Sequence, residues 1–347
     1  METRQCGKSD LRLSVLGMGC WAFGGGKYWG AQSQSDVNAT VQAAVDFGIN
    51  YFDSAEAYNN GGSESSLGEA LKLVPRDKVI VGTKISPSNV APDELPKHWD
   101  ESRKRLGVDY VDLYMVHWPI TLRSIYHFNT EMKVCPPVEE AFATLMKMRD
   151  EGKIRYIGVS NFGPAKMDEA LATGADIAIN ELPRNLLCRA IEYEILPYCK
   201  RKGIGILGYM ALLQGILADI FPTLDDVPPM QRRTRHFDSR KCREVRHGEN
   251  GHEAEINAAL QAIRAIGKDL GLTMPQVAVK WAISNPAVTS TLVGARNARE
   301  LEDNAKAVTE PLPAEVIERL NQATDEVKEK MGPSFDYYET RANDRTI

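Results

Sequence analysis

Polar residues close most of the short, β-branched apolar runs in this sequence. They are Asp53, Lys84, His117, Ser160 with Asn161, Glu181 and Tyr209. If these runs are parallel strands of a barrel, their carboxyl ends meet on one face, where barrel enzymes hold their active sites. An acid, a lysine and a histidine would then converge there. Such a set is suited to moving a proton to or from a reacting group.

The apolar runs alternate with helical patterns, which predicts parallel strands joined by helices. The expected strands cover 14–17, 49–53, 79–84, 111–117, 154–160, 177–181, 204–209 and 289–294. The expected helices cover 35–47, 63–73, 92–106, 138–151, 164–172, 190–202, 253–270 and 298–307. This pattern predicts an α/β fold of the TIM-barrel type, (β/α)8.

Segments outside these units predict additions to the barrel. An N-terminal β-hairpin is expected at its floor, and residues 313–331 predict an extra C-terminal helix followed by a tail at 332–347. Two connections, 118–137 and 210–252, exceed ordinary βα loops and should lie on the catalytic face. No linker rich in Gly, Ser or Pro divides the chain, so one domain over 1–347 is expected.

The amino-acid composition argues against several classes of binding partner. The chain has 42 Lys and Arg against 47 Asp and Glu, a formal charge of −5, which gives no global attraction to nucleic acid or anionic lipid. Its longest uncharged run, 203–218, has 16 residues, fewer than the roughly 20 of a membrane span. The start METRQCGKSD lacks a secretory core, and the scattered cysteines argue against a zinc site. We expect a cytoplasmic protein with a small-molecule partner, without a metal, and able to form an oligomer.

Several blocks resemble one family. YFDSAEAYNNGGSESSLGEAL, which holds Asp53 and Tyr58, resembles the aldo-keto reductase signature. Five further segments resemble other blocks of the same family, in the same order: LRLSVLGMGCWAFGG, VGTK, YVDLYMVHWP, GKIRYIGVSNF and VGARNARELEDN. The resemblance covers residues 11–307 and implies an NADP-dependent oxidoreductase that reduces an aldehyde or ketone.

The resemblance assigns roles that agree with elementary chemistry. Tyr58 would donate the proton to the carbonyl oxygen. The Lys84 ammonium would lower the tyrosine pKa from its ordinary value of about 10. Asp53 would keep Lys84 charged, and His117 would hydrogen-bond the carbonyl oxygen. Flat walls of the substrate pocket are expected from Trp29 and Trp118.

A nicotinamide must supply the hydride, because no side chain can. The chain has no Rossmann G-x-G-x-x-G after a strand. By the resemblance, Ser160 and Asn161 contact the carboxamide and Tyr209 stacks on the ring. Glu181 stands where the family commonly has Gln, so it accepts the amide protons but donates none back. Arg184 replaces a common Tyr.

The far end of the nucleotide is expected at the last strand. There Gly294 permits close backbone approach, and Arg296 matches a position that grips the 2′-phosphate of NADP. Glu300 could instead bond ribose hydroxyls, which would favour NAD; we predict NADP(H) over NAD(H). The basic stretch 231–247 is interpreted as a clasp over the pyrophosphate or a solvated loop. The expected nucleotide set is completed by Gln214 and Asn304.

Alternatives stay open. One is an NAD-dependent sugar or alcohol dehydrogenase running the same chemistry in reverse, and another is a non-catalytic binding protein resembling potassium-channel β subunits. A Schiff-base lyase acting through Lys84 leaves Tyr58 unexplained. A carbohydrate-like substrate is suggested by Arg123, Tyr126 and His127. The aromatic tail segment 335–338 is expected to close the site above Trp29 and His117 or to form an oligomer contact.

Overall fold

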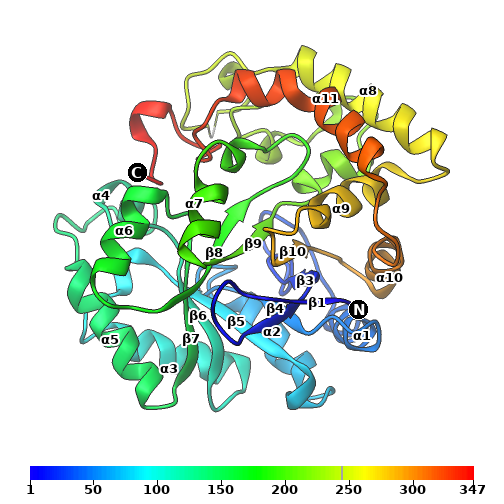
Figure 1. Ribbon diagram of the computed structural model, residues 1–347. Helices are drawn as coiled ribbons and strands as arrows, with labels where there is room; N and C mark the ends of the chain where they lie inside the picture. Colours follow the sequence, from blue (N-terminus) through cyan, green and yellow to red (C-terminus); the bar gives the residue numbers. More distant parts are fainter. Residues whose placement is uncertain (244) are drawn as a thin grey trace.

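The computed structural model describes residues 1–243 and 245–347, and within them eight parallel strands close into one barrel (Figure 1). Strand order around the barrel follows the chain, and pairing of the last strand with the first closes it. The strands are β3 (Leu16–Gly19), β4 (Tyr51–Asp53), β5 (Ile80–Ile85), β6 (Val111–Val116), β7 (Ile154–Ser160), β8 (Ile177–Pro183), β9 (Gly205–Tyr209) and β10 (Ser290–Val293). The predicted (β/α)8 TIM barrel is confirmed.

Helices surround the barrel, and local signals set their ends. The Ser33 hydroxyl accepts the Asp36 N–H at 3.1 Å and caps the first helix. Gly203 ends α7 at φ 68°, a left-handed conformation that glycine adopts without a Cβ clash. The helices are α1 (Gln34–Asp46), α2 (Gly62–Leu71), α3 (Leu95–Leu106), α4 (Leu122–Ile125), α5 (Val138–Asp150), α6 (Pro164–Ala172), α7 (Ile195–Lys202), α8 (Glu253–Asp269), α9 (Met274–Ser284), α10 (Ala298–Ala307) and α11 (Ala314–Met331).

The predicted N-terminal hairpin is present. Strands β1 (Thr3–Gln5) and β2 (Arg12–Ser14) pair antiparallel. Side chains of this hairpin, including Leu11 and Leu13, are buried in one apolar cluster with Leu113 of β6. The hairpin therefore covers the amino-terminal end of the barrel, opposite the strand ends that carry the candidate site.

Two helices were missed by the sequence prediction, the four-residue α4 in the long connection 118–137 and α9. The helix packed on β10 is α9, whereas the expected 253–270 helix, α8, packs against α11 on the outside (Figure 1). Residues 277–283 of α9 are all buried, Lys280 included, so the segment shows only a narrow polar stripe of Gln276, Lys280 and Ser284 from which a helical period could be read. Thr273 and Gln276 form a capping box at its start, which is the signal that was available.

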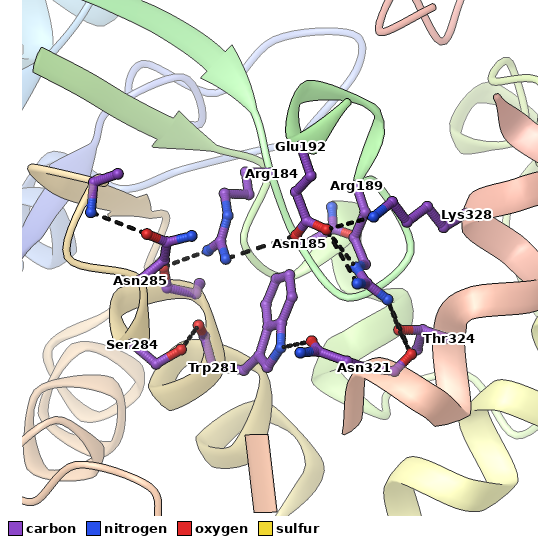
Figure 2. A network of polar contacts seen from close by, with 12 residues as sticks. Arg184, Asn185, Arg189, Glu192, Trp281, Ser284, Asn285, Asn321, Thr324 and Lys328 are labelled. Atoms are coloured by element: carbon purple, nitrogen blue, oxygen red, sulfur yellow. Dashed lines mark hydrogen bonds and ion pairs between the residues drawn. The ribbon is translucent and has the colours of Figure 1, made fainter. Parts of the chain in front are cut away.

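A polar network ties the loop after β8 to the outer helices (Figure 2). The Arg184 guanidinium lies 4.2 Å from the centroid of the Trp281 ring, and burial lowers its pKa to about 10, so it stays a cation at neutral pH. The Trp281 indole N–H donates to Asn321 of α11 at 2.9 Å. Arg184 therefore packs behind the barrel end and does not line the cavity described below.

Across the described residues, no helix combines the length and apolar character needed to cross a membrane. The expectation of one domain over 1–347 stays a prediction.

Candidate active site

A cavity of about 730 Å³ opens at the carboxyl ends of the strands. Both long connections and the tail contribute to its wall. The predicted catalytic, nucleotide-binding and aromatic wall residues all line it except Lys84: Trp29, Asp53, Tyr58, His117, Trp118, Ser160, Asn161, Glu181, Tyr209, Gln214, Gly294, Arg296, Glu300 and Asn304. Of the three residues that suggested a carbohydrate-like substrate, His127 lines the cavity and Arg123 and Tyr126 do not.

Lys84 lies beneath the cavity floor with no exposed surface. Its Nζ donates to the carboxylate of Asp53, to the Ser54 carbonyl at 3.1 Å and to the Tyr58 hydroxyl at 3.3 Å. The first contact follows from the fold, because β4 and β5 are neighbours and both residues stand near their carboxyl ends. Lys84 is thus fixed directly behind the hydroxyl that faces the cavity.

A second carboxyl group approaches the same lysine. Glu181 Oε2 lies 3.2 Å from Lys84 Nζ, without hydrogen-bond alignment to it or to any other described residue. Burial raises the pKa of both Glu181 and Asp53, and the Lys84 charge opposes this rise. Burial alone would lower the pKa of Lys84, but the two carboxyl groups hold it well above its ordinary value. Lys84 therefore stays charged.

The expectation that Lys84 leaves Tyr58 with a lowered pKa is not met. Burial raises the Tyr58 pKa, and although Lys84 lowers it, Glu181 and Asp53 raise it further, so the net shift is upward. Tyr58 is consequently a neutral phenol at neutral pH. That state suits a proton donor.

We expect Glu181→Gln to shift the pH dependence of carbonyl reduction. Removing the carboxylate removes one of the charges that raise the Tyr58 pKa. A proton donor is active below its pKa, so the high-pH limb of kcat/KM should move to lower pH in the variant. A pH–rate profile at saturating cofactor measures this, with the exposed Glu302→Gln as control. A limb that stays in place or moves upward contradicts the coupling.

His117 faces Tyr58 across the cavity. Their rings meet edge to face at 5.5 Å between centroids. Burial, then the Lys84 charge, holds the His117 pKa well below its ordinary value, so the ring is neutral at neutral pH. Its Nδ1 is buried and has no hydrogen-bond partner among the described residues. Because His117 lines the cavity and no described residue hydrogen-bonds its ring nitrogens, the imidazole is available to a ligand there.

Two aromatic residues of this wall were missed in the sequence. Trp21 and Tyr28 stack at 5.0 Å, and Trp21 lies 5.9 Å from the Tyr58 ring. Trp29 meets Trp21 edge to face at 5.1 Å. The available signal was four large aromatic residues, Trp21, Phe23, Tyr28 and Trp29, in the glycine-rich loop after the first barrel strand.

The residues expected at the nicotinamide end form a connected set. Asn161 Oδ1 accepts the Tyr209 hydroxyl at 2.8 Å, and its Nδ2 donates to the His117 carbonyl at 3.1 Å. Gln214 accepts from Tyr28 at 2.6 Å. These contacts link the loops that follow β6, β7 and β9 to the loop after β3.

The opposite end of the cavity lies at the start of α10. Arg296 donates to the Ala31 carbonyl at 2.5 Å and to Gln32 Oε1 at 3.3 Å, and its backbone N–H donates to Glu300 at 2.9 Å. Arg296 and Glu300 thus stand side by side at one end, as expected. The Glu300 carboxylate already accepts a backbone hydrogen bond there.

The tail closes one side of the cavity. Arg345 lies 3.8 Å from the centroid of the Trp118 ring and bonds both carboxylate oxygens of Asp336, at 2.7 and 2.8 Å. Tyr338 lines the cavity, whereas Tyr337 is buried against its own chain. The tail is therefore part of the wall. Its predicted role in an oligomer is untested.

In the described part of the chain, no three His, Cys, Asp or Glu side chains gather as ligands for a metal ion.

A closed parallel barrel with a Tyr, Lys, Asp and His cluster at its strand ends is the arrangement expected above for a (β/α)8 oxidoreductase. The family model "Aldo/keto reductase family" matches residues 15–325. The chain belongs to the aldo/keto reductase family.

Relatives differ in substrate. The chain is 30% identical to the NADH-specific methylglyoxal reductase of Escherichia coli K12, over 89% of this chain and 94% of the relative. It is 29% identical to the L-glyceraldehyde 3-phosphate reductase of the same organism, over 89% and 88%. Among solved structures, the glycerol dehydrogenase from Gluconobacter oxydans superposes with a TM-score of 0.72 at 28% identity, covering 95% of this chain and 96% of that chain.

Proposed function

We propose that this protein transfers hydride between NADP(H) and an aldehyde or ketone. The observation that carries the proposal is the Tyr58 hydroxyl, which is 3.3 Å from the buried Lys84 ammonium and faces the same cavity as His117. Family membership supports the reaction class. The cytoplasmic location stays an expectation.

The cavity offers groups that suit a nicotinamide dinucleotide. The Glu181 carboxyl group lines the cavity together with Ser160 and Asn161 and would accept a carboxamide N–H. The Tyr209 ring would stack on the nicotinamide. A bound nicotinamide dinucleotide would supply or accept the hydride.

In the proposed reduction, the Tyr58 hydroxyl gives its proton to the carbonyl oxygen. Lys84 stabilises the phenolate that remains, because its ammonium is adjacent and is kept charged by Asp53. Neutral His117 donates a ring N–H to the same oxygen and orients the carbonyl. In alcohol oxidation the same proton returns to Tyr58.

Spectrophotometric turnover tests the proposal. A panel of aldehydes and ketones is offered with NADPH and with NADH, and oxidation of the reduced nucleotide is followed. The proposal is supported if the wild type turns over a carbonyl and the Tyr58→Phe variant does not. Nucleotide binding without turnover of any carbonyl favours the channel-β-subunit-like binding protein instead.

We expect NADPH to bind more tightly than NADH, and Arg296→Ala to narrow the difference. The guanidinium lies at the cavity end, where a 2′-phosphate would meet it, and charge-assisted hydrogen bonds contribute about 1.5–3 kcal/mol, or roughly one to two decades of affinity. Fluorescence titration of both nucleotides measures the ratio. The nearby Arg299→Ala serves as control. Equal wild-type affinities, or an unchanged ratio in Arg296→Ala, contradict the assignment.

A second candidate is an NAD-linked alcohol dehydrogenase with the same proton path. It is favoured by Glu300, whose carboxylate could accept ribose hydroxyls, and by the name of the NADH-specific relative. The nucleotide titration above separates the two candidates.

A further inference from the structure

Most cations of the basic stretch 231–247 are used within the protein, where the structure describes them. Arg232 donates to backbone carbonyls of its own loop, Arg235 donates to carbonyls at the end of α11 and in the tail, and Arg246 pairs with Glu339. The stretch therefore does not act as one patch. Its cations differ in which of their N–H donors remain available to a ligand.

Arg233 is different from these neighbours. Its guanidinium lines the cavity and lies 5.0 Å from the centroid of the Tyr28 ring. Its Nε is buried without a hydrogen-bond partner, and no ion pair joins it to a carboxylate of the described residues. A buried guanidinium N–H that lacks an acceptor is costly, unless a ligand supplies one.

A second unpartnered donor lies next to the same ring. The Trp29 indole Nε1 is buried in the cavity wall without an acceptor, and Trp29 meets Tyr28 edge to face at 5.0 Å. Of the other cations that line the cavity, Arg246 and Arg345 are balanced by their own carboxylates, and Arg296, at the start of α10, is the one assigned above to the nucleotide. Donors of Arg233 and Trp29 thus remain for an acceptor-rich group.

We propose that Arg233, with the Trp29 indole N–H, binds a phosphate group carried by the carbonyl substrate. Arginine presents a planar fork of donors that matches phosphate oxygens. The proposal rests on the proposed reductase function and adds the substrate class, a phosphorylated aldehyde or ketone. The aromatic path from Tyr58 through Trp21 to Tyr28 places Arg233 on the wall shared with the catalytic tyrosine.

The proposal is tested by binding, which needs no turnover. Calorimetric titration compares glycerol 3-phosphate with glycerol on the wild type, on Arg233→Gln and on Arg240→Gln. Arg240 is an exposed cation of the same stretch, pairs with Asp238 and does not line the cavity. We expect the wild type and Arg240→Gln to prefer the phosphate ester by about tenfold to a hundredfold, and Arg233→Gln to lose that preference.

Turnover measurements and nucleotide titrations show whether Arg233 binds the substrate phosphate or the nucleotide. The ratio of kcat/KM for glyceraldehyde 3-phosphate over glyceraldehyde should fall in Arg233→Gln, and Arg233→Lys should recover part of it. No wild-type preference, or an unchanged ratio in Arg233→Gln, overturns the proposal. A loss of nucleotide affinity with the ratio intact also overturns it, because Arg233 then serves the nucleotide. If no carbonyl turns over but the calorimetric preference holds, the reductase proposal fails while the phosphate site stands.

Discussion

Tyr58→Phe is expected to lower kcat for carbonyl reduction by about 100-fold to 10,000-fold. The substitution removes the hydroxyl that lies 3.3 Å from Lys84 and leaves the ring that packs against Trp21 and His117. The hydroxyl makes no contact with the residues expected to hold the nucleotide, so nucleotide affinity should be nearly unchanged.

The measurement is single-turnover reduction at saturating nucleotide, paired with fluorescence titration of the nucleotide. Tyr156→Phe is the matched control, because the Tyr156 hydroxyl donates to Asp10 of the hairpin turn at the other end of the barrel. Wild-type rates in Tyr58→Phe would remove the tyrosine from the chemistry. Equal losses in both variants would assign the effect to stability.

Asp336→Asn is expected to detach the tail from the cavity wall. Arg345 and Asp336 are both buried, and removing one partner of such a pair leaves an uncompensated charge, which costs about 3–5 kcal/mol. The amide oxygen can still accept one hydrogen bond, so a value of about 3 kcal/mol is expected. Because Arg345 lies on Trp118, KM for the carbonyl should rise more than kcat falls.

Thermal unfolding, proteolysis of the tail and steady-state kinetics report this result. The control is Asp269→Asn, which breaks an exposed pair with Arg319 whose side chains are 49% and 62% accessible. An exposed pair of this kind contributes about 0–1 kcal/mol. Equal melting temperatures and KM values in the two variants would show that the buried pair does not hold the wall.

The barrel and the residues at its strand ends could be predicted from local patterns. Asp53, Lys84 and His117 each end a β-branched run, and parallel strands bring such ends together whatever the loops do. The same reasoning failed for α9, because its seven consecutive buried residues leave only a narrow polar stripe.

Electrostatic relations within the site could not be predicted this way. The upward pKa shift of Tyr58 depends on burial and on Glu181, which reaches Lys84 from the far side of the barrel. No spacing in the sequence encodes that distance. The roles of the arginines in the basic stretch could not be predicted either. Only the folded loop shows that Arg235 donates to carbonyls of the tail whereas Arg233 lines the cavity.

The cavity wall draws on the whole length of the chain, and this has a consequence during synthesis. Trp21 belongs to the first barrel loop, whereas Tyr338 and Arg345 are added after all eight strands. A ribosome joins about 5–20 residues per second, and domains fold as units while they emerge. While Tyr338 and Arg345 are still inside the ribosome, the cavity lacks this part of its wall, so a ligand that needs it cannot yet stabilise the barrel. Translational pausing before residue 338 would leave all eight barrel strands synthesised but the cavity without Tyr338 and Arg345 in its wall.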